Sequence, residues 1–179
     1  MNRFLVSGLS LFFLACSPAP EEVPEPPAAE ATVPSISILD YAGLEAAVEA
    51  REGSGYLLNF WALWCAPCVE ELPHLVHVAQ RYRERGGEVI GVSYDLMIPG
   101  DDATSIMPKM TSFMQRRTID LPVWIYDEDD YEQINARFDL PGEVPVTLAI
   151  DKDGKIVDRQ EGAADEARFE DMMRKALGI

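Results

Sequence analysis

Cysteine is scarce in this sequence, which limits the kinds of thiol chemistry it can support. The 179 residues contain three cysteines, at positions 16, 65 and 68. Cys16 lies in a short apolar segment, so the body of the chain carries one pair, Cys65 and Cys68, spaced as Cys-x-x-Cys. A structural zinc site needs four ligands, and a single pair is a poor candidate for one.

Basic residues are also few. Lys and Arg number 15 against 31 Asp and Glu, which gives a net charge of −16. This balance argues against nucleic acid as a partner, and an anionic membrane surface would repel the body of the protein. The hydrophobic fraction of 47% and the length fit one ordinary domain with additional ends.

A long apolar run is missing too. The stretch from Phe4 to Ala15 is shorter than the about 20 residues that a transmembrane helix needs. Arg3 precedes it, so residues 1–16 are predicted to be a secretory signal.

This signal ends in Phe13-Leu14-Ala15-Cys16, which resembles the lipobox of bacterial lipoproteins. The resemblance implies a lipid on Cys16, which would attach the protein to a membrane that it does not cross. A plain signal peptide that is cut elsewhere, with Cys16 discarded, is the alternative. Ser17 stands where an Asp would indicate retention at the inner membrane, so the outer membrane is favoured.

Residues 17–34 are rich in Pro, Ala and Glu and are predicted to be an extended, semi-rigid tether. The domain is therefore expected to occupy residues 35–179. Within it, apolar runs of strand type alternate with patterns of helical period, which predicts an α/β fold of three layers with a mixed sheet. The predicted strands are 35–39, 56–61, 88–94, 121–126, 144–150 and 156–160, and the predicted helices are about 40–51, 66–85, 106–117, 131–138 and 165–177.

The cysteine pair lies between the strand 56–61 and the helix that follows it. Free N–H groups and the positive dipole end at the start of a helix favour a thiolate, so Cys65 is predicted to be the attacking thiol. Cys68 lies one turn later on the same face and can resolve a mixed disulfide on Cys65. Cys65 is expected at the exposed end of the motif beside Trp64, and Cys68 deeper in the protein. The alternatives are a structural disulfide and a metal clip.

The stretch Phe60-Trp61-Ala62-x-Trp64-Cys65-x-Pro67-Cys68 resembles the thioredoxin superfamily, and further details resemble its TlpA/ResA branch of extracytoplasmic thiol-disulfide oxidoreductases. Asn59 stands where ordinary thioredoxins have a buried Asp, and an extra helix and strand precede the helix 131–138. Glu71-Leu72-Pro73 and Val144-Pro145 also match the branch. The pair Ala66-Pro67 between the cysteines is uncommon, which leaves the reduction potential open.

The resemblance implies roles for five more residues. Glu71 would give and take protons for the cysteines, although a first-turn Glu that only favours the helix dipole is the alternative. Pro145 is expected in the cis form, which would bring the backbone of Val144 against Cys65 to pair with an extended substrate. Trp64 would contact the substrate. Asn59 is expected to be buried and hydrogen-bonded.

Three other patterns resemble metal sites but do not fit one. His74 and His77 lie too far along the helix for one metal to reach them and both cysteines, so they are expected on the helix surface. Met107, Met110 and Met114 have helical spacing and are expected to form a buried stripe. The acidic run 127–130 lacks a full calcium-loop pattern and is expected to be a solvated turn.

These observations predict a lipid-anchored oxidoreductase on the periplasmic side of a bacterial membrane, with no cofactor beyond the Cys65–Cys68 disulfide. By resemblance it would reduce protein disulfides, with cytochrome c biogenesis or a copper-site protein as possible contexts, and a membrane electron donor would re-reduce it. The alternatives are an oxidase or isomerase on the same fold, or a copper(I) metallochaperone without enzymatic activity.

Overall fold

The computed structural model describes Met1 and residues 35–179. The predicted signal 1–16 with Cys16, and the predicted tether 17–34, lie outside the described residues. No helix in the described part of the chain is both long and apolar enough to span a bilayer. The strands are β1 (Ile36–Leu39), β2 (Tyr56–Trp61), β3 (Glu88–Ser93), β4 (Val123–Tyr126), β5 (Val146–Ile150) and β6 (Ile156–Glu161), and the α-helices are α1 (Tyr41–Glu49), α2 (Ala66–Tyr82), α3 (Ala103–Arg117), α4 (Tyr131–Phe138) and α5 (Glu166–Leu177).

The strands form one mixed sheet in the order β1-β4-β3-β2-β5-β6. The first four strands in this order pair in parallel, whereas β5 is antiparallel to both β2 and β6. The predicted mixed sheet is therefore confirmed. β2 is central and buried along its whole length, and it leads directly to the cysteine pair.

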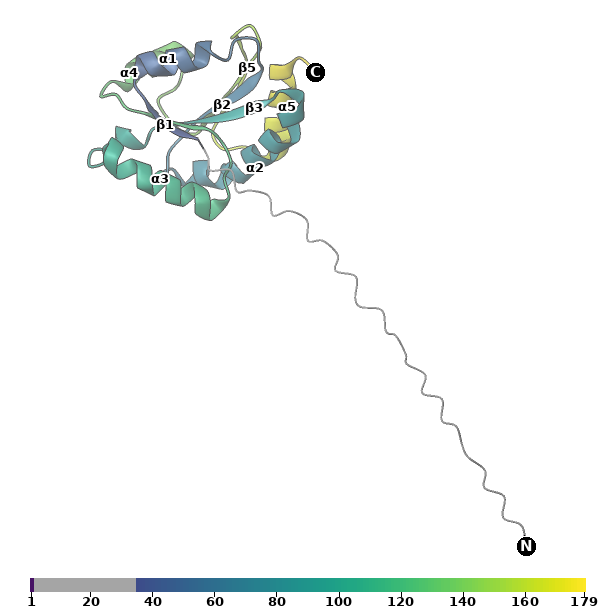
Figure 1. Cartoon of the computed structure of the whole chain (residues 1–179). Coiled ribbons are helices and arrows are strands. Elements are labelled where there is room, and N and C mark those ends of the chain that lie inside the picture. Colours follow the sequence, from purple (N-terminus) through teal and green to yellow (C-terminus); the bar gives the residue numbers. More distant parts are fainter. Residues whose placement is uncertain (2–34) are drawn as a thin grey trace. The chain divides into compact units, whose positions relative to one another are not determined.

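Two apolar cores lie on the two faces of this sheet. Alternate residues of β2 point to opposite faces: Leu57 and Trp61 pack in the core with α2, α3 and α5, while Leu58 and Phe60 pack in the core with α1 and α4. Figure 1 shows α2, α3 and α5 on one side of the sheet and α1 and α4 on the other. This is the predicted arrangement of three layers.

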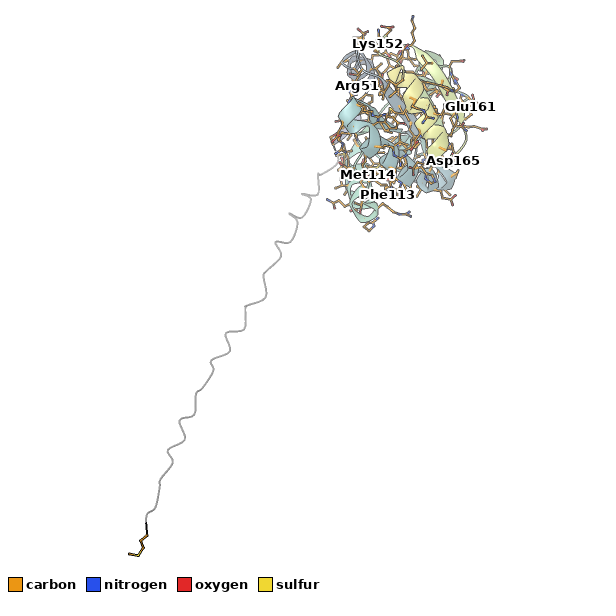
Figure 2. The ribbon with its side chains drawn as sticks, turned by 90° about the vertical axis from the view of Figure 1, so that its right-hand side faces the viewer. Arg51, Phe113, Met114, Lys152, Glu161 and Asp165 are labelled. Atoms are coloured by element: carbon orange, nitrogen blue, oxygen red, sulfur yellow. A yellow bond between two sulfur atoms is a disulfide. The ribbon has the colours of Figure 1, made fainter. Side chains whose placement is uncertain are left out.

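The domain has two distinct ends along the strands. Figure 2 shows Phe113 and Met114 of α3 and Asp165, which caps α5, toward one end, and Lys152 of the turn between β5 and β6 toward the opposite end. The N–H of Gly53, just before β2, donates to the carbonyl oxygen of Lys152, so β2 begins at the Lys152 end. It runs from there to the opposite end, with Phe113 and Asp165, which therefore carries the cysteine pair.

Several element boundaries differ from the prediction. α3 begins at Ala103 and not at Ile106, because Asp102 and Ser105 cap each other's backbone N–H groups in a capping box. The predicted loop before it contains a short 3₁₀ helix, Asp95–Met97. The long helix α2 ends at Tyr82, and a 3₁₀ turn, Arg83–Arg85, completes the predicted stretch. β4 and β5 each begin two residues later than predicted.

Gly91 of β3 illustrates how tightly the central strands are packed. A Cβ atom at this position would lie 2.7 Å from Nε1 of Trp61, which is too close for any ordinary contact. Glycine thus allows the Trp61 indole to lie against β3, where its other neighbour is the Phe113 ring at 5.9 Å between centroids.

Candidate active site

The cysteines lie at the start of α2, as predicted, and form a disulfide. Cys65 is the N-cap residue of the helix, and the backbone N–H of Cys68 donates to its Sγ at 3.3 Å. Pro67 lies in the first turn, where its missing N–H costs no helical hydrogen bond. In the dithiol form the same N–H can stabilise a thiolate on Cys65.

Burial of the pair differs in part from the prediction. Cys68 is 0% exposed and is the deeper of the two, as expected, but Cys65 is only 6% exposed and does not lie at an open end. The exposed residues of the motif are its neighbours, with Trp64 46% exposed. Cys65 is covered in part because the chain at Val144 lies against its sulfur.

The Val144–Pro145 peptide bond is cis, which confirms that expectation. The carbonyl oxygen of Val144 lies 3.7 Å from Sγ of Cys65. The sulfur of a disulfide has no proton to donate, so this is a van der Waals contact here. A Cys65 thiol could donate to the same oxygen. The structure therefore brings together Cys65 and Val144, which are separated by 79 positions in the sequence.

Glu71 and Asn59 form a buried polar cluster behind the disulfide. Nδ2 of Asn59 donates to Oε1 of Glu71 and to Oγ1 of Thr147, at 2.9 Å each. Oε2 of Glu71 accepts from the backbone N–H of Ala164 at 3.2 Å. Asn59 is buried and hydrogen-bonded, as predicted, and Glu71 lies one helical turn after Cys68 on the same face of α2.

The environment of Glu71 changes its acidity. The residue is only 2% exposed, and burial raises the pKa of its carboxyl group from the ordinary 4.5 to about 7. The hydrogen bonds from Asn59 and Ala164 oppose this shift only in part. Glu71, His74 and Asp165 nevertheless line an open hollow of about 310 Å³, so the carboxyl group has a short path to solvent. A group with this pKa can both accept and release a proton near neutral pH.

Asp95 is a buried carboxylate that sequence reasoning missed. It follows β3 and is 4% exposed. The backbone N–H of Leu63 donates to both its oxygens, at 2.9 and 3.2 Å, and the Ser93 hydroxyl donates to Oδ2 at 2.6 Å. Because Leu63 comes two residues before Cys65, Asp95 fixes the loop that leads from β2 to the disulfide. Burial raises the pKa of Asp95 as well. Within the sequence the only signal was an Asp directly after a buried strand.

The residues set aside as metal ligands are used in other ways. Nδ1 of His77 lies 3.0 Å from Oε2 of Glu166 in α5. Met110 and Met114 are fully buried in the core, and Met107 packs against it, which confirms the predicted stripe. The acidic run 127–130 is exposed, as predicted for a turn, and Asp130 caps α4.

Comparisons with known proteins agree with this geometry. The family model described as Redoxin matches residues 28–175. The thiol-disulfide oxidoreductase ResA of Bacillus thuringiensis (strain Al Hakam) is 30% identical over 142 residues, which are 79% of this chain and 75% of that protein.

Solved structures share the fold. A thiol:disulfide interchange protein of the thioredoxin family from Chlorobium tepidum TLS has a TM-score of 0.60 and 24% identity, and the match covers 73% of this chain and 84% of that one. The exposed lipoprotein thioredoxin Etrx1 of Streptococcus pneumoniae strain TIGR4 has a TM-score of 0.54 and 21% identity, covering 71% of this chain and 88% of that one. The chain therefore belongs to the Redoxin family, with the thioredoxin fold, as a ResA-like thiol-disulfide oxidoreductase.

Proposed function

We propose that this protein reduces disulfides of protein substrates outside the cytoplasm through the Cys65–Cys68 pair. The observation that carries the proposal is the placement of Cys65. It is the N-cap of α2, it accepts from the N–H of Cys68, and it touches the backbone of Val144. The first two contacts favour a thiolate on Cys65. The third places a peptide backbone beside it, with which a substrate can pair.

The exchange has two steps that balance in atoms and electrons. The Cys65 thiolate attacks a substrate disulfide, which forms a mixed disulfide and releases one substrate thiolate. Cys68 loses its proton and attacks Sγ of Cys65, which breaks the mixed disulfide and releases the second substrate thiolate. The protein ends with the Cys65–Cys68 disulfide seen in the structure. Two electrons pass to the substrate, and its two sulfurs take up two protons.

Glu71 is the residue we assign to the proton of Cys68. Its raised pKa of about 7 and its position one turn after Cys68 support this role. The Asn59 amide can hydrogen-bond to both forms of Glu71. Its Nδ2 donates to the carboxylate, and after rotation by half a turn its Oδ1 can accept from the protonated acid. Oδ1 of Asn59 has no partner in the described structure and is available for that second state.

Trp64 and Val144 would hold the substrate. The exposed Trp64 ring offers apolar surface directly beside Cys65. The Val144 backbone, which the cis peptide bond to Pro145 places against Cys65, can pair with an extended peptide. Proteins with exposed disulfides, including apocytochrome c and copper-site proteins, are the substrate class we propose. The disulfide is the only redox group that this scheme needs, and a membrane dithiol donor would restore the reduced form.

Attachment and location belong to the same proposal. The lipobox-like sequence ending at Cys16 supports a lipid anchor on the periplasmic side of a membrane, the outer one being favoured. Etrx1, one of the proteins with this fold, is described as an exposed lipoprotein. Mass spectrometry of the protein and its Cys16→Ser variant, expressed in a diderm bacterium with labelled palmitate, tests this. Label that is retained by the variant would contradict it.

The reduction potential of the Cys65–Cys68 pair tests the direction of the reaction. Equilibration in thiol–disulfide buffers, followed by alkylation and mass measurement, gives the value. A potential near that of thioredoxin, about −270 mV, or lower would support a reductase, whereas about −120 mV would indicate an oxidant. If no intramolecular disulfide forms in any buffer, the exchange mechanism is wrong and a copper(I) site at the cysteines becomes the better hypothesis.

The order of attack can be tested with matched variants. Cys68→Ser should accumulate a mixed disulfide with a substrate protein, because nothing remains to resolve it, whereas Cys65→Ser should trap almost none. Non-reducing gels and peptide mapping distinguish the two. Equal trapping by both variants would contradict the assignment of Cys65 as the nucleophile.

A further inference from the structure

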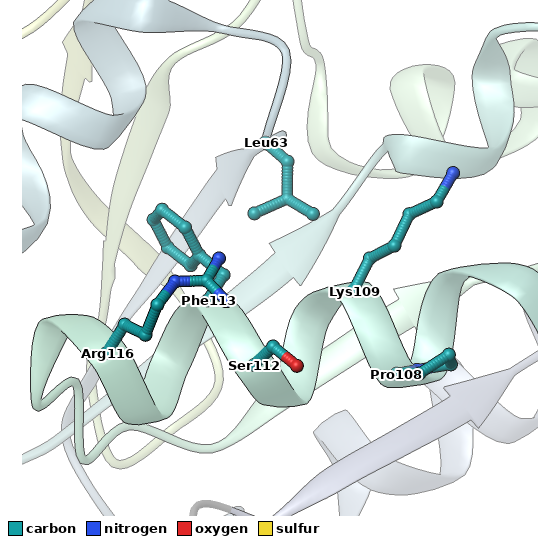
Figure 3. Close-up of a pocket in the computed structure, with 6 residues that line it drawn as sticks. All are labelled: Leu63, Pro108, Lys109, Ser112, Phe113 and Arg116. Carbon is teal, nitrogen blue, oxygen red and sulfur yellow. The ribbon is translucent and has the colours of Figure 1, made fainter.

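A groove lies directly beside the redox loop. It has a volume of about 490 Å³ and is walled by Leu63 on one side and by one face of α3 on the other. Figure 3 shows Leu63 facing the helix, with Lys109 and Arg116 on either side of it. Phe113 forms an apolar part of the wall between those two cations, and its ring contacts Trp61 of β2. A ligand in the groove would therefore touch the loop two residues before Cys65.

The helix that forms this wall differs in charge from the rest of the domain. α3 contains three cations and no Asp or Glu, whereas each of the other four described α-helices contains at least one carboxylate. The chain as a whole has a net charge of −16, so this helix gives the groove a basic wall on an acidic protein.

The cations of α3 are not equivalent. Lys109 pairs with Asp101, so its charge is partly compensated. Arg117 does not line the groove, and its guanidinium carbon lies 5.7 Å from the centroid of the Phe113 ring. Arg116 lines the groove, and its side chain forms no hydrogen bond or ion pair within residues 35–179. Of the two cations that line the groove, Arg116 is therefore the more available to a ligand.

We propose that this groove binds a short acidic and apolar segment of the protein substrate, next to the disulfide to be reduced. Leu63 and Phe113 would contact the apolar side chain, and Arg116 would pair with a carboxylate. The inference rests on the proposed function, because it gives that function a substrate preference.

The cations that line the groove favour a partner that carries a carboxylate. A basic segment would meet Arg116 and Lys109 as like charges, and an uncharged one would leave the arginine without a partner. An acidic protein is repelled by most of this chain, so attraction at one groove would favour the orientation that brings its disulfide to Cys65. Such an effect weakens as salt is added.

The test uses the purified full chain and three matched peptides. Each contains a leucine followed by two glutamates, two glutamines or two lysines, and then a cysteine. For turnover, the cysteine forms a mixed disulfide with a fluorescent thiol. For binding, serine replaces the cysteine, and fluorescence polarisation against the oxidised protein gives Kd. Binding decides the question even if turnover is slow.

The expected result is a preference for the glutamate peptide over the glutamine peptide of about two- to fivefold, the range for an exposed ion pair. Arg116→Gln should abolish the preference, and Arg116→Glu should transfer it to the lysine peptide. Arg117→Gln is the matched control, with the same loss of charge on the same helix outside the groove, and it should keep the preference.

Three outcomes would overturn the inference: no preference in the unaltered protein, a preference that survives Arg116→Gln, or one that Arg117→Gln removes equally. The last would indicate a general effect of net charge. Reduction of the glutamine peptide at the same rate by all variants would leave the proposed function intact. Absence of reduction of every peptide would instead contradict the proposed function, while the binding data would still decide on the groove.

Discussion

Replacement of Glu71 by Gln should change how the stability of the oxidised protein depends on pH. Burial raises the pKa of this carboxyl group from 4.5 to about 7. Between these two values the folded chain holds a proton that the unfolded chain has lost. Folding therefore becomes less favourable as the pH rises through this window, and it is most favourable at and below pH 4.5 as far as Glu71 is concerned.

The size of the effect follows from the shift. One pKa unit corresponds to about 1.4 kcal/mol, so a shift from 4.5 to about 7 makes Glu71 cost about 3 kcal/mol of unfolding free energy once it is ionised. Gln does not ionise. It also loses the hydrogen bond from the N–H of Ala164 to Oε2, which costs about 1 kcal/mol at every pH. The slope with pH, and not the absolute stability, is therefore the quantity to compare.

Urea unfolding of the oxidised protein, in steps of half a pH unit from pH 4.5 to 8.5, measures how the unfolding free energy depends on pH. We expect the unfolding free energy of Glu71→Gln, minus that of the unaltered protein, to rise by about 3 kcal/mol across this range. Other titrating groups contribute equally to both proteins and cancel in the difference. Glu70→Gln is the matched control, because Glu70 is the exposed neighbour on the same helix, and its difference should stay nearly flat.

A flat difference for Glu71→Gln would refute the reasoning. It would mean that the carboxyl group ionises as freely in the folded protein as in water, and that burial does not govern its acidity. The proposal that Glu71 acts as a general acid and base would then lack support. The alternative, a first-turn Glu that only favours the helix dipole, would explain the residue.

Two further substitutions test the surroundings of the disulfide. Asp95→Asn keeps one oxygen for the N–H of Leu63 but removes the charge. We expect a loss of about 1–3 kcal/mol in unfolding free energy, and faster hydrogen exchange of the Leu63 amide by NMR. Unchanged exchange at Leu63 would contradict the role of Asp95 in positioning this loop. Gly91→Ala places a methyl group 2.7 Å from Nε1 of Trp61. It should lower the unfolding free energy in urea by about 1–3 kcal/mol and shift the Trp61 fluorescence. An unchanged unfolding free energy would show that the indole can move aside.

Features that depend on local sequence could be predicted well. The disulfide at the start of α2 followed from a buried strand, a Cys-x-x-Cys pair and Pro67 within a few residues of one another. The buried Asn59 and the cis bond before Pro145 came from resemblance to a family and not from the residues alone. The start of α3 was missed because the capping pair, Asp102 and Ser105, was assigned to the preceding loop.

Features that depend on strand register could not be predicted. Asp95 and Leu63 are 32 positions apart, and they meet only because β2 and β3 pair in parallel with Trp61 opposite Ser93. A shift of two residues in this register would carry Asp95 past the loop and leave its carboxylate without the Leu63 N–H. The burial of Cys65 has the same origin, since Val144 reaches it through the pairing of β2 with β5.

Leu63 links these features. Its backbone is fixed by the buried carboxylate of Asp95, and its side chain is a wall of the groove on α3. A residue held at its N–H by charged hydrogen bonds cannot move without leaving that carboxylate buried and unpaired, which costs more than one ordinary hydrogen bond. The distance from the groove to Cys65 is thus set by the fold. A substrate segment bound there would present its disulfide at a constant position. The Cys65 sulfur is enclosed, so disulfide exchange requires the substrate to approach it in a defined geometry.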